Sequence, residues 1–238
     1  MKGALYLSDS YIREWEAMVE AAEGRIILLD STAFYPAGGG QPADKGIMKN
    51  PDGRVFSVLS VSKRDGRIYH EVDSDGLKAG ESVSCELDWE RRYRLMRMHT
   101  ATHILCAVIH KHTRALITGN QLDVERTRVD FNLDDFDKNK VQGYADEANK
   151  IIAQGKDVRI YFMKRGEALS IPSVVKLANS LPPQIEELRI VEIPGIDLQA
   201  DGGTQVRNTS EIGRIRIEAM ENKGKNNRRI YFTLEQAL

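Results

Sequence analysis

The chain has 238 residues, of which 34 are lysine or arginine and 35 are aspartate or glutamate, so its formal net charge is −1. With 41% hydrophobic and 29% charged residues it has the composition of a globular protein, and no apolar run approaches the ~18 residues of a membrane span. Cys85 and Cys106 form no disulfide framework, and the near-neutral charge argues against a protein that coats nucleic acid non-specifically. We therefore expect a cytoplasmic protein with no membrane partner.

The first part of the chain predicts a small β domain. Residues 11–22 carry apolar residues at helical spacing and predict a helix. Alternation or short apolar runs, separated by turn signals, predict strands at residues 25–30, 54–60, 67–72 and 82–88. We thus expect a small, mostly antiparallel β domain over residues 1–88, which hold 10 basic and 15 acidic residues, a net charge of −5.

After Asp88 the pattern of apolar residues changes, and long helical patterns alternate with predicted strands. Helical patterns cover residues 89–112, 139–154 and 167–179, the last broken near Pro172. Strands are predicted at residues 124–132, 157–163, 187–193, 204–208, 212–220 and 228–234. Without a regular βαβ period, this order predicts an α+β protein, with an antiparallel sheet packed against helices in residues 89–238. That part holds 24 basic and 20 acidic residues, so it is the candidate for an anionic partner.

The strongest constellation is His99-Thr100-Ala101-Thr102-His103. Two histidines four residues apart on a helix share one face and can converge on one metal ion. The glutamate base of the zinc-protease motif is absent, so that chemistry is not implied. Cys106 and His110 lie a turn or more further along, out of easy reach of the same ion. Ordinary packing or surface histidines remain the alternative reading.

Two glycine-rich segments could support chemistry. In Asp201-Gly202-Gly203-Thr204-Gln205, the two glycines allow close backbone approach, and the two terminal residues offer oxygen ligands; a plain hairpin turn is the alternative. In the loop Gly38-Gly39-Gly40-Gln41, exposed backbone amides can bind an anion or a carbonyl, and the glutamine adds a donor and an acceptor.

Two basic clusters suit phosphate contacts, although each alone is equally typical of a solvated surface. The clusters are Arg91, Arg92, Arg94 and Arg97, and then Lys223, Lys225, Arg228 and Arg229.

Four segments in this order, TAFYPAGGGQPADKG, RRYRLMRMHTATHIL, DGGTQVRNTSEIG and NKGKNNRRIYF, carry a resemblance that covers essentially the whole chain. The sequence resembles the alanyl-tRNA editing proteins of the AlaX type, which are free-standing relatives of the editing domain of alanyl-tRNA synthetase. Its length matches the medium form, with a β domain before the α/β editing domain. The resemblance implies a trans-editing hydrolase that deacylates Ser-tRNA(Ala), and sometimes Gly-tRNA(Ala), by zinc-assisted attack of water.

The resemblance also implies roles for particular residues. His99 and His103 match the zinc ligands of the family, whereas Asp201 and Gln205 stand where the family usually has cysteine and histidine. One Zn2+ ion per chain is implied, with an open coordination position or a weakened affinity as competing consequences. As a mechanistic hypothesis, the backbone amides of Gly202 and Gly203, or those of the Gly38–Gly40 loop, stabilise the oxyanion. The residues implied in substrate binding are Thr32, Gly38, Gly39, Gly40, Gln41 and Thr204. The residues implied in tRNA binding are Arg91, Arg92, Lys223, Lys225, Arg228 and Arg229.

The partner implied is tRNA(Ala) charged with the wrong amino acid, and the chain is expected to be a monomer or a weak homodimer. Two alternatives stay open at this point. One is a tRNA-binding homologue with a weakened metal site and no catalysis, and the other is a metal-dependent esterase for small molecules.

Overall fold

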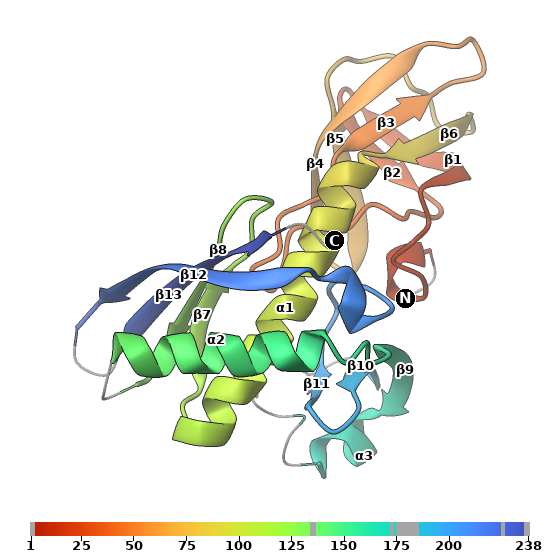
Figure 1. The fold of residues 1–238 in the computed structure, drawn as a ribbon. Helices are drawn as coiled ribbons and strands as arrows, with labels where there is room; N and C mark the ends of the chain where they lie inside the picture. Colours follow the sequence, from red (N-terminus) through yellow and green to blue (C-terminus); the bar gives the residue numbers. More distant parts are fainter. Residues whose placement is uncertain (1–2, 134–136, 172–173, 175–185, 225–226, 236–238) are drawn as a thin grey trace. The chain divides into compact units, whose positions relative to one another are not determined.

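A computed structural model describes residues 3–133, 137–171, 174, 186–224 and 227–235 (Figure 1). Backbone contacts divide the chain into two compact units, Met1–Leu95 and Met96–Leu238. The domain boundary predicted near Asp88 lies at the start of helix α1 (Trp89–Thr113), and the division between the units falls inside that helix. Antiparallel sheets and helices together confirm the predicted α+β class.

The first unit is built around a closed barrel. Its strands are β1 (Glu14–Glu23), β2 (Ile26–Leu29), β3 (Gly46–Lys49), β4 (Val55–Arg64), β5 (Arg67–Val72) and β6 (Ser82–Leu87). They follow the order β1-β2-β5-β4-β3-β6, each antiparallel to its neighbours. Alternate side chains of β5 and β6 point inward, where they pack around Phe34 and Phe56. The sequence predicts β2, β4, β5 and β6 but not the short β3, nor the single 3-10 turn η1 (Leu5–Leu7).

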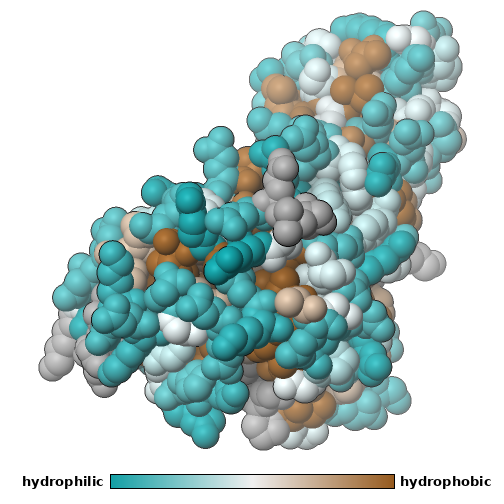
Figure 2. Space-filling model, viewed as in Figure 1, coloured by the Kyte–Doolittle hydropathy of each residue, from teal (hydrophilic) through white to brown (hydrophobic). Residues whose placement is uncertain are grey.

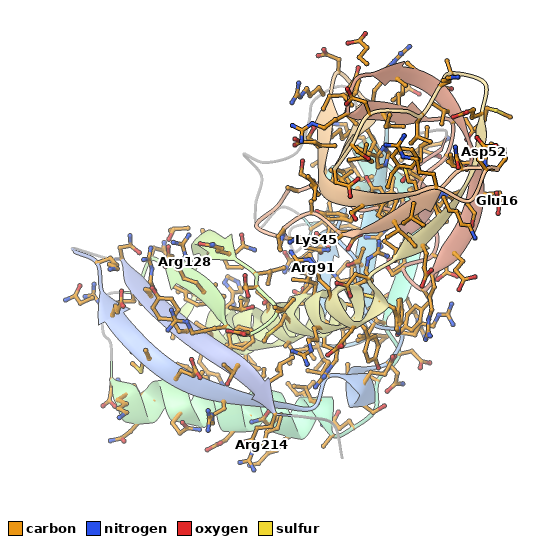
Figure 3. All side chains as sticks on the ribbon, turned by 90° about the horizontal axis from the view of Figure 1, so that it is seen from above. Glu16, Lys45, Asp52, Arg91, Arg128 and Arg214 are labelled. Carbon is orange, nitrogen blue, oxygen red and sulfur yellow. The ribbon has the colours of Figure 1, made fainter. Side chains whose placement is uncertain are left out.

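The helix predicted for residues 11–22 is wrong, because most of this segment forms β1. Ala17 and Val19 are buried while Glu16 and Met18 are exposed, so the segment alternates as a strand does. Figure 3 shows the side chain of Glu16 directed away from the barrel. The helical spacing of its apolar residues is overridden by pairing with β2 on one side and β6 on the other.

The second unit contains a four-stranded sheet covered by a helix (Figure 1). Its strands, in the order β12-β13-β8-β7, are β12 (Arg214–Asn222), β13 (Arg228–Glu235), β8 (Thr127–Phe131) and β7 (Ile117–Gln121). Helix α2 (Lys138–Ile152) begins at the capping residue Asp137 and packs along β12. The side chain of Asn149 joins the two elements, since it bonds both the N–H and the C=O of Ile215. The sequence predicts α2, β8, β12 and β13 but not β7.

A three-stranded sheet in the order β11-β10-β9 completes the second unit. Its strands are β9 (Arg159–Lys164), β10 (Glu187–Ile193) and β11 (Asp197–Ala200), with helix α3 (Arg165–Leu169) following β9. The predicted helix at 167–179 overlaps α3, and most of its remainder lies outside the described residues. The strand predicted at 204–208 is wrong: its residues Thr204, Gln205 and Val206 are all buried, without the alternation of a strand. The segment leads instead into the short 3-10 helix η3 (Thr209–Glu211), and residues 197–200 supply the strand that pairs with β10.

The helices and the surface of the described residues have the polar character expected from the 29% of charged residues in the sequence. Within the described residues, no helix is both long enough and apolar enough to cross a membrane. The face of the molecule seen in Figure 2 is mostly hydrophilic, and its apolar residues form small, separate areas.

Candidate metal centre

Helix α1 carries the histidine pair into the interior of the protein. Every residue from Met98 to Ile109 is buried, so the polar side chains on this stretch need partners within the protein. The hydroxyls of Thr100 and Thr102 reach carbonyl oxygens one turn earlier, at 3.1 Å and 2.8 Å. His99 and His103 share one face of the helix, with ring centroids 5.1 Å apart. The predicted spacing therefore gives two buried imidazoles side by side.

The segment after β11 brings two more polar residues to the histidines. Oδ2 of Asp201 lies 3.6 Å from Nε2 of His99 and 3.7 Å from Nε2 of His103. Nε2 of Gln205 lies 2.9 Å from the same carboxylate oxygen and 3.3 Å from Nε2 of His103. The structure thus brings together the four residues that the sequence predicts as metal ligands.

The spacing of these atoms fits a metal ion. Donor atoms arranged tetrahedrally at zinc-ligand distances stand about 3.3–3.4 Å apart. The separations of 2.9–3.7 Å between the facing atoms of this cluster lie close to that value. His99, His103 and Asp201 each offer one ligand atom, and these atoms lie within 4.8 Å of one another. The amide oxygen of Gln205 accepts a hydrogen bond from Thr100 at 2.7 Å, so in this structure its amide nitrogen faces the cluster.

The protonation of the cluster also suits a cation. Burial lowers the pKa of His99 to about 4, opposed by Asp201 and reinforced by His103 and Arg189, which keeps its ring neutral. For His103, burial disfavours the charged form, but hydrogen bonds to two carboxylates outweigh it and raise the pKa to about 9. Burial alone would raise the pKa of Asp201, yet the two histidines and Arg189 hold it well below its usual range. The cluster therefore contains an ionised carboxylate, a neutral imidazole and an imidazole whose Nε2 proton a cation would replace.

Asp197 orients His103 from the side away from the cluster. Its Oδ2 lies 2.9 Å from Nδ1 of His103, and the same oxygen accepts a hydrogen bond of 2.7 Å from Gln199. All three side chains are buried. An Nδ1 proton shared with a carboxylate leaves Nε2 as the atom that faces a metal, which is the usual arrangement around metal-bound histidines.

The backbone around Asp201 is fixed by neighbouring groups. Arg189 on β10 donates from its guanidinium to the carbonyl oxygen of Asp201 at 2.7 Å. The N–H of Gly203 donates to the carboxylate oxygens of Asp201 at 3.1 Å and 3.2 Å. In this structure the Gly203 amide therefore supports the carboxylate rather than a substrate oxyanion. Apart from Gly202 itself and the residues on either side of it, no atom of the described residues would lie within 4 Å of a Cβ added at Gly202.

Sequence reasoning did not single out Asp197, Thr100 or Arg189. For Asp197 a signal was present, because Asp197 and Gln199 alternate along β11 and share its buried face. Polar residues at two-residue spacing on an inward face indicate a polar cluster. The part played by Arg189 and Thr100 depends on contacts with residues 12 and 105 positions away, which local patterns do not reveal.

Thr32, predicted to bind substrate, is buried in the first unit. Its hydroxyl accepts a hydrogen bond from the N–H of Phe34 and lies 2.9 Å from Nε2 of His70. Nδ1 of His70 lies 3.1 Å from the carbonyl oxygen of Ile27, so Nδ1 carries the proton and Nε2 accepts from Thr32. The threonine is thereby held in one orientation by the barrel.

The glycine loop forms a tight turn in the same unit. Gly38 and Gln41 exchange backbone hydrogen bonds of 3.0 Å and 2.9 Å. Gly39 and Gly40 between them have φ values of 58° and 83°, the left-handed conformation that this two-residue turn requires. Turn geometry therefore accounts for two of the three glycines, and the side chain of Gln41 is buried beside them.

One predicted tRNA contact is wrong. Arg92 has no exposed surface, and its guanidinium is bonded to the carboxylate of Asp44 and to the carbonyl oxygens of Ser10 and Ala33. A side chain enclosed in this way cannot reach a phosphate. The local sequence does not reveal that Arg92 is buried, because a run of arginines at the start of a helix is typical of a solvent-exposed, charged face.

The other predicted tRNA contacts that lie within the described residues keep some exposure. Arg91 is partly exposed and donates to the carbonyl oxygen of Ala43 (Figure 3). Lys223 is exposed beside Glu221 at 2.7 Å, and Arg229 pairs with Asp130 at 2.7 Å. Arg228 bonds backbone and side-chain oxygens of the β12–β13 turn. Thr204, which is predicted to bind substrate and not tRNA, is fully buried. Lys225 lies outside the described residues.

Comparison with known proteins places this arrangement among tRNA-related proteins. The family model described as the second additional domain of threonyl and alanyl tRNA synthetases matches residues 188–231. The model described as class II (A) tRNA synthetases matches residues 8–91.

Relatives that align with nearly the whole chain are also tRNA-related proteins. The alanyl-tRNA editing protein AlaX-M of Saccharolobus solfataricus is 48% identical over 237 residues, which cover 99% of this chain and 100% of that protein. AlaX-M of Methanosarcina barkeri is also 48% identical, covering 98% of this chain and 99% of its own length. The alanine–tRNA ligase of Ignicoccus hospitalis is 35% identical over 90% of this chain, which spans only 24% of that ligase.

Proposed function

The chain belongs to the family of alanyl-tRNA editing proteins, and from that premise we propose that it hydrolyses the ester of tRNA(Ala) wrongly charged with serine. The observation that carries the proposal is the cluster of two buried histidines, His99 and His103, with the partly exposed Asp201, whose facing atoms have the spacing of a metal site. Glycine, whose side chain is smaller still, is the second substrate to be tested. The products are free tRNA and the free amino acid.

We propose that His99, His103, Asp201 and Gln205 hold one zinc ion. Two imidazoles and a carboxylate are a ligand set found in catalytic zinc sites, and a glutamine oxygen is a weak fourth ligand. When bound, zinc acts as a Lewis acid that polarises an ester carbonyl or a water molecule.

The residues of the chain then have separate tasks. Asp197 holds the proton at Nδ1 of His103. Arg189 and the Gly203 amide fix the backbone and the carboxylate of Asp201. The hydroxyl of Thr100 is engaged by Met96, Gln205 and Val206, so it is not available as a nucleophile. Direct attack by water is therefore the proposed route: a bond forms from water oxygen to the ester carbon, the bond to the ribose oxygen breaks, and that oxygen takes a proton.

Selection of the amino acid is assigned to the first unit. Thr32 and Gln41 are polar residues of this unit that are each 2% exposed, and Gln41 closes the turn at Gly38, Gly39 and Gly40. A site that hydrogen-bonds the serine hydroxyl discriminates against alanine, because the alanine side chain forms no such bond. We expect Gln41→Ala to reduce the preference for Ser-tRNA(Ala) over Ala-tRNA(Ala). Equal preference in the parent and the variant would remove Gln41 from the proposal.

The basic residues that remain accessible are assigned to the phosphates of tRNA. Within the described residues these are Arg91, Lys223, Arg228 and Arg229, and Lys225 is assigned with them on its place in the sequence alone. Contacts of this kind make affinity fall as salt rises, with a slope set by the number of phosphates neutralised. We expect Lys223→Gln to reduce the steepness of the plot of log affinity against log salt concentration by about one, the change expected for one lost phosphate contact.

The decisive assay compares Ser-tRNA(Ala) with Ala-tRNA(Ala) for the parent protein and for His99→Ala and Asp201→Ala. The parent should deacylate the serine ester far faster than the alanine ester, and both variants should lose that activity. An exposed acidic residue on α2 provides the matched control, so Asp146→Ala should behave as the parent. A small serine ester run in parallel identifies an esterase for small molecules if it is hydrolysed as fast as the tRNA ester.

A tRNA-binding homologue without catalysis is the second candidate. The observation that favours it is the amide nitrogen of Gln205, which bonds His103 and Asp201 and closes the cluster with hydrogen bonds. Salt-sensitive tRNA binding, with no zinc retained and no deacylation, would identify this alternative.

We also propose that the protein acts in the cytoplasm, as a monomer or weak homodimer. Neither Cys85 nor Cys106 is in a disulfide, which is in keeping with the proposed cytoplasmic location.

A further inference from the structure

The hydroxyl of Thr100 has more acceptors than it has protons. Its Oγ lies 3.1 Å from the carbonyl oxygen of Met96 and 2.7 Å from Oε1 of Gln205. The N–H of Val206 donates to the same hydroxyl at 3.2 Å. A hydroxyl has one proton, so Thr100 donates either to the helix carbonyl or to the glutamine, but not fully to both at once.

This surplus allows the amide of Gln205 two orientations, of which the second is satisfied only when a cation lies in the cluster. In the first, Nε2 faces Asp201 and His103, while Oε1 accepts the proton of Thr100. In the second, the amide is turned by half a rotation, so that its oxygen faces the cluster and its NH2 group donates outward to Thr100. The threonine proton then goes to the carbonyl oxygen of Met96, which is already within reach.

We propose that Thr100 is the positioning residue of Gln205, and that it allows the amide to present nitrogen to the empty cluster and oxygen to a bound cation. The proposal rests on the metal site of the proposed function and adds a residue that is not a ligand. A buried amide that turned without such a partner would leave a polar group unsatisfied, at a cost comparable to a lost hydrogen bond. Gln205 is 1% exposed and Thr100 is fully buried, so water does not replace this partner.

The helix offers a matched control in Thr102. It is buried, lies on the same helix, and bonds the carbonyl oxygen one turn earlier at 2.8 Å, as Thr100 does. Replacing either threonine by valine removes a hydroxyl of the same kind with little change of volume. Of the two threonines, Thr100 is the one hydrogen-bonded to Gln205, so its replacement and not that of Thr102 should alter metal binding.

The test measures metal binding rather than activity. Zinc affinity is obtained by competition with a chromophoric chelator, and the visible absorption of the Co2+-loaded protein reports the number and type of ligands. We expect Thr100→Val to weaken zinc binding about 10- to 100-fold, the range for partners that orient a ligand. Its Co2+ spectrum should approach that of Gln205→Leu. Thr100→Ser should restore both properties, and Thr102→Val should match the parent.

A double-mutant cycle separates a positioning role from general damage. If Thr100 acts through Gln205, the pair Thr100→Val and Gln205→Leu should bind zinc no more weakly than Gln205→Leu alone. Additive losses, or a Thr100→Val protein with the parent's affinity and spectrum, would overturn the positioning role while leaving the metal site intact. Thr100→Ala serves in the same cycle if the valine variant is poorly folded. A parent protein that binds neither Zn2+ nor Co2+ would overturn the metal site itself and this inference with it.

Discussion

Nδ1 of His103 and Oδ2 of Asp197 lie 2.9 Å apart, with both side chains buried. This contact fixes which nitrogen of the imidazole faces Asp201. The proposed metal site would therefore depend on a carboxylate that is not among its proposed ligands.

Asp197→Ala should weaken zinc binding about 10- to 100-fold, because His103 loses the partner that fixes its ring and its proton. Asp146→Ala, at an exposed position on α2, should leave the affinity unchanged. Competition with a chelator measures both. An unchanged affinity for Asp197→Ala would show that His103 is oriented by the helix alone.

Asp201→Cys should raise zinc affinity, because a thiolate is a softer and stronger ligand for zinc than a carboxylate. The same change should lower the affinity for Mn2+, which prefers oxygen, so the ratio of the two dissociation constants is the informative quantity. Asp123→Cys, in an exposed turn, controls for an added thiol. A zinc-to-manganese ratio equal to the parent's would contradict a direct contact between residue 201 and the ion.

The first unit should lose stability in acid through His70. Burial lowers the pKa of this histidine to about 4, against 6.5 in a model peptide, so the unfolded chain binds the proton more readily. Stability from this group is complete above pH 6.5 and decreases as the pH falls toward 4, by about 3 kcal/mol in all. Both tryptophans, Trp15 and Trp89, lie in the first unit, so urea titrations followed by tryptophan fluorescence at pH 7 and 4.5 measure the effect. In His70→Gln the free energy of unfolding should differ less between pH 7 and pH 4.5 than it does in the parent. A difference as large as the parent's would assign the acid sensitivity to other groups.

Arg92→Met should destabilise the first unit by about 3–5 kcal/mol, because it leaves the carboxylate of Asp44 buried without its partner. Arg94→Met is the matched control, since Arg94 and its partner Glu90 are exposed and such pairs contribute little. The same fluorescence titration applies. If the two variants unfold at similar urea concentrations, the buried pair does not have the structural role assigned to it here.

The sequence predicts local elements better than it predicts tertiary contacts. The spacing of His99 and His103 is set by one helix, so its geometry follows directly from the sequence. The pairing of β1 with β2 and β6 depends on segments elsewhere in the chain, and without them its apolar spacing resembles a helix. The same limit applies to Arg92, whose partner Asp44 lies 48 positions away, and to Asp197, 94 positions from His103. Long-range polar pairs of this kind have no signature in either local sequence alone.

Metal-dependent deacylation of Ser-tRNA(Ala) is the central proposal for this protein. The measurement is the rate of ester hydrolysis by protein stripped of metal with a chelator, dialysed, and then titrated with Zn2+. We predict that activity is lost on stripping and returns in proportion to zinc bound, reaching its maximum at one ion per chain. Full activity in the stripped protein, or zinc binding at one ion per chain with no hydrolysis of the serine ester, would contradict the proposal.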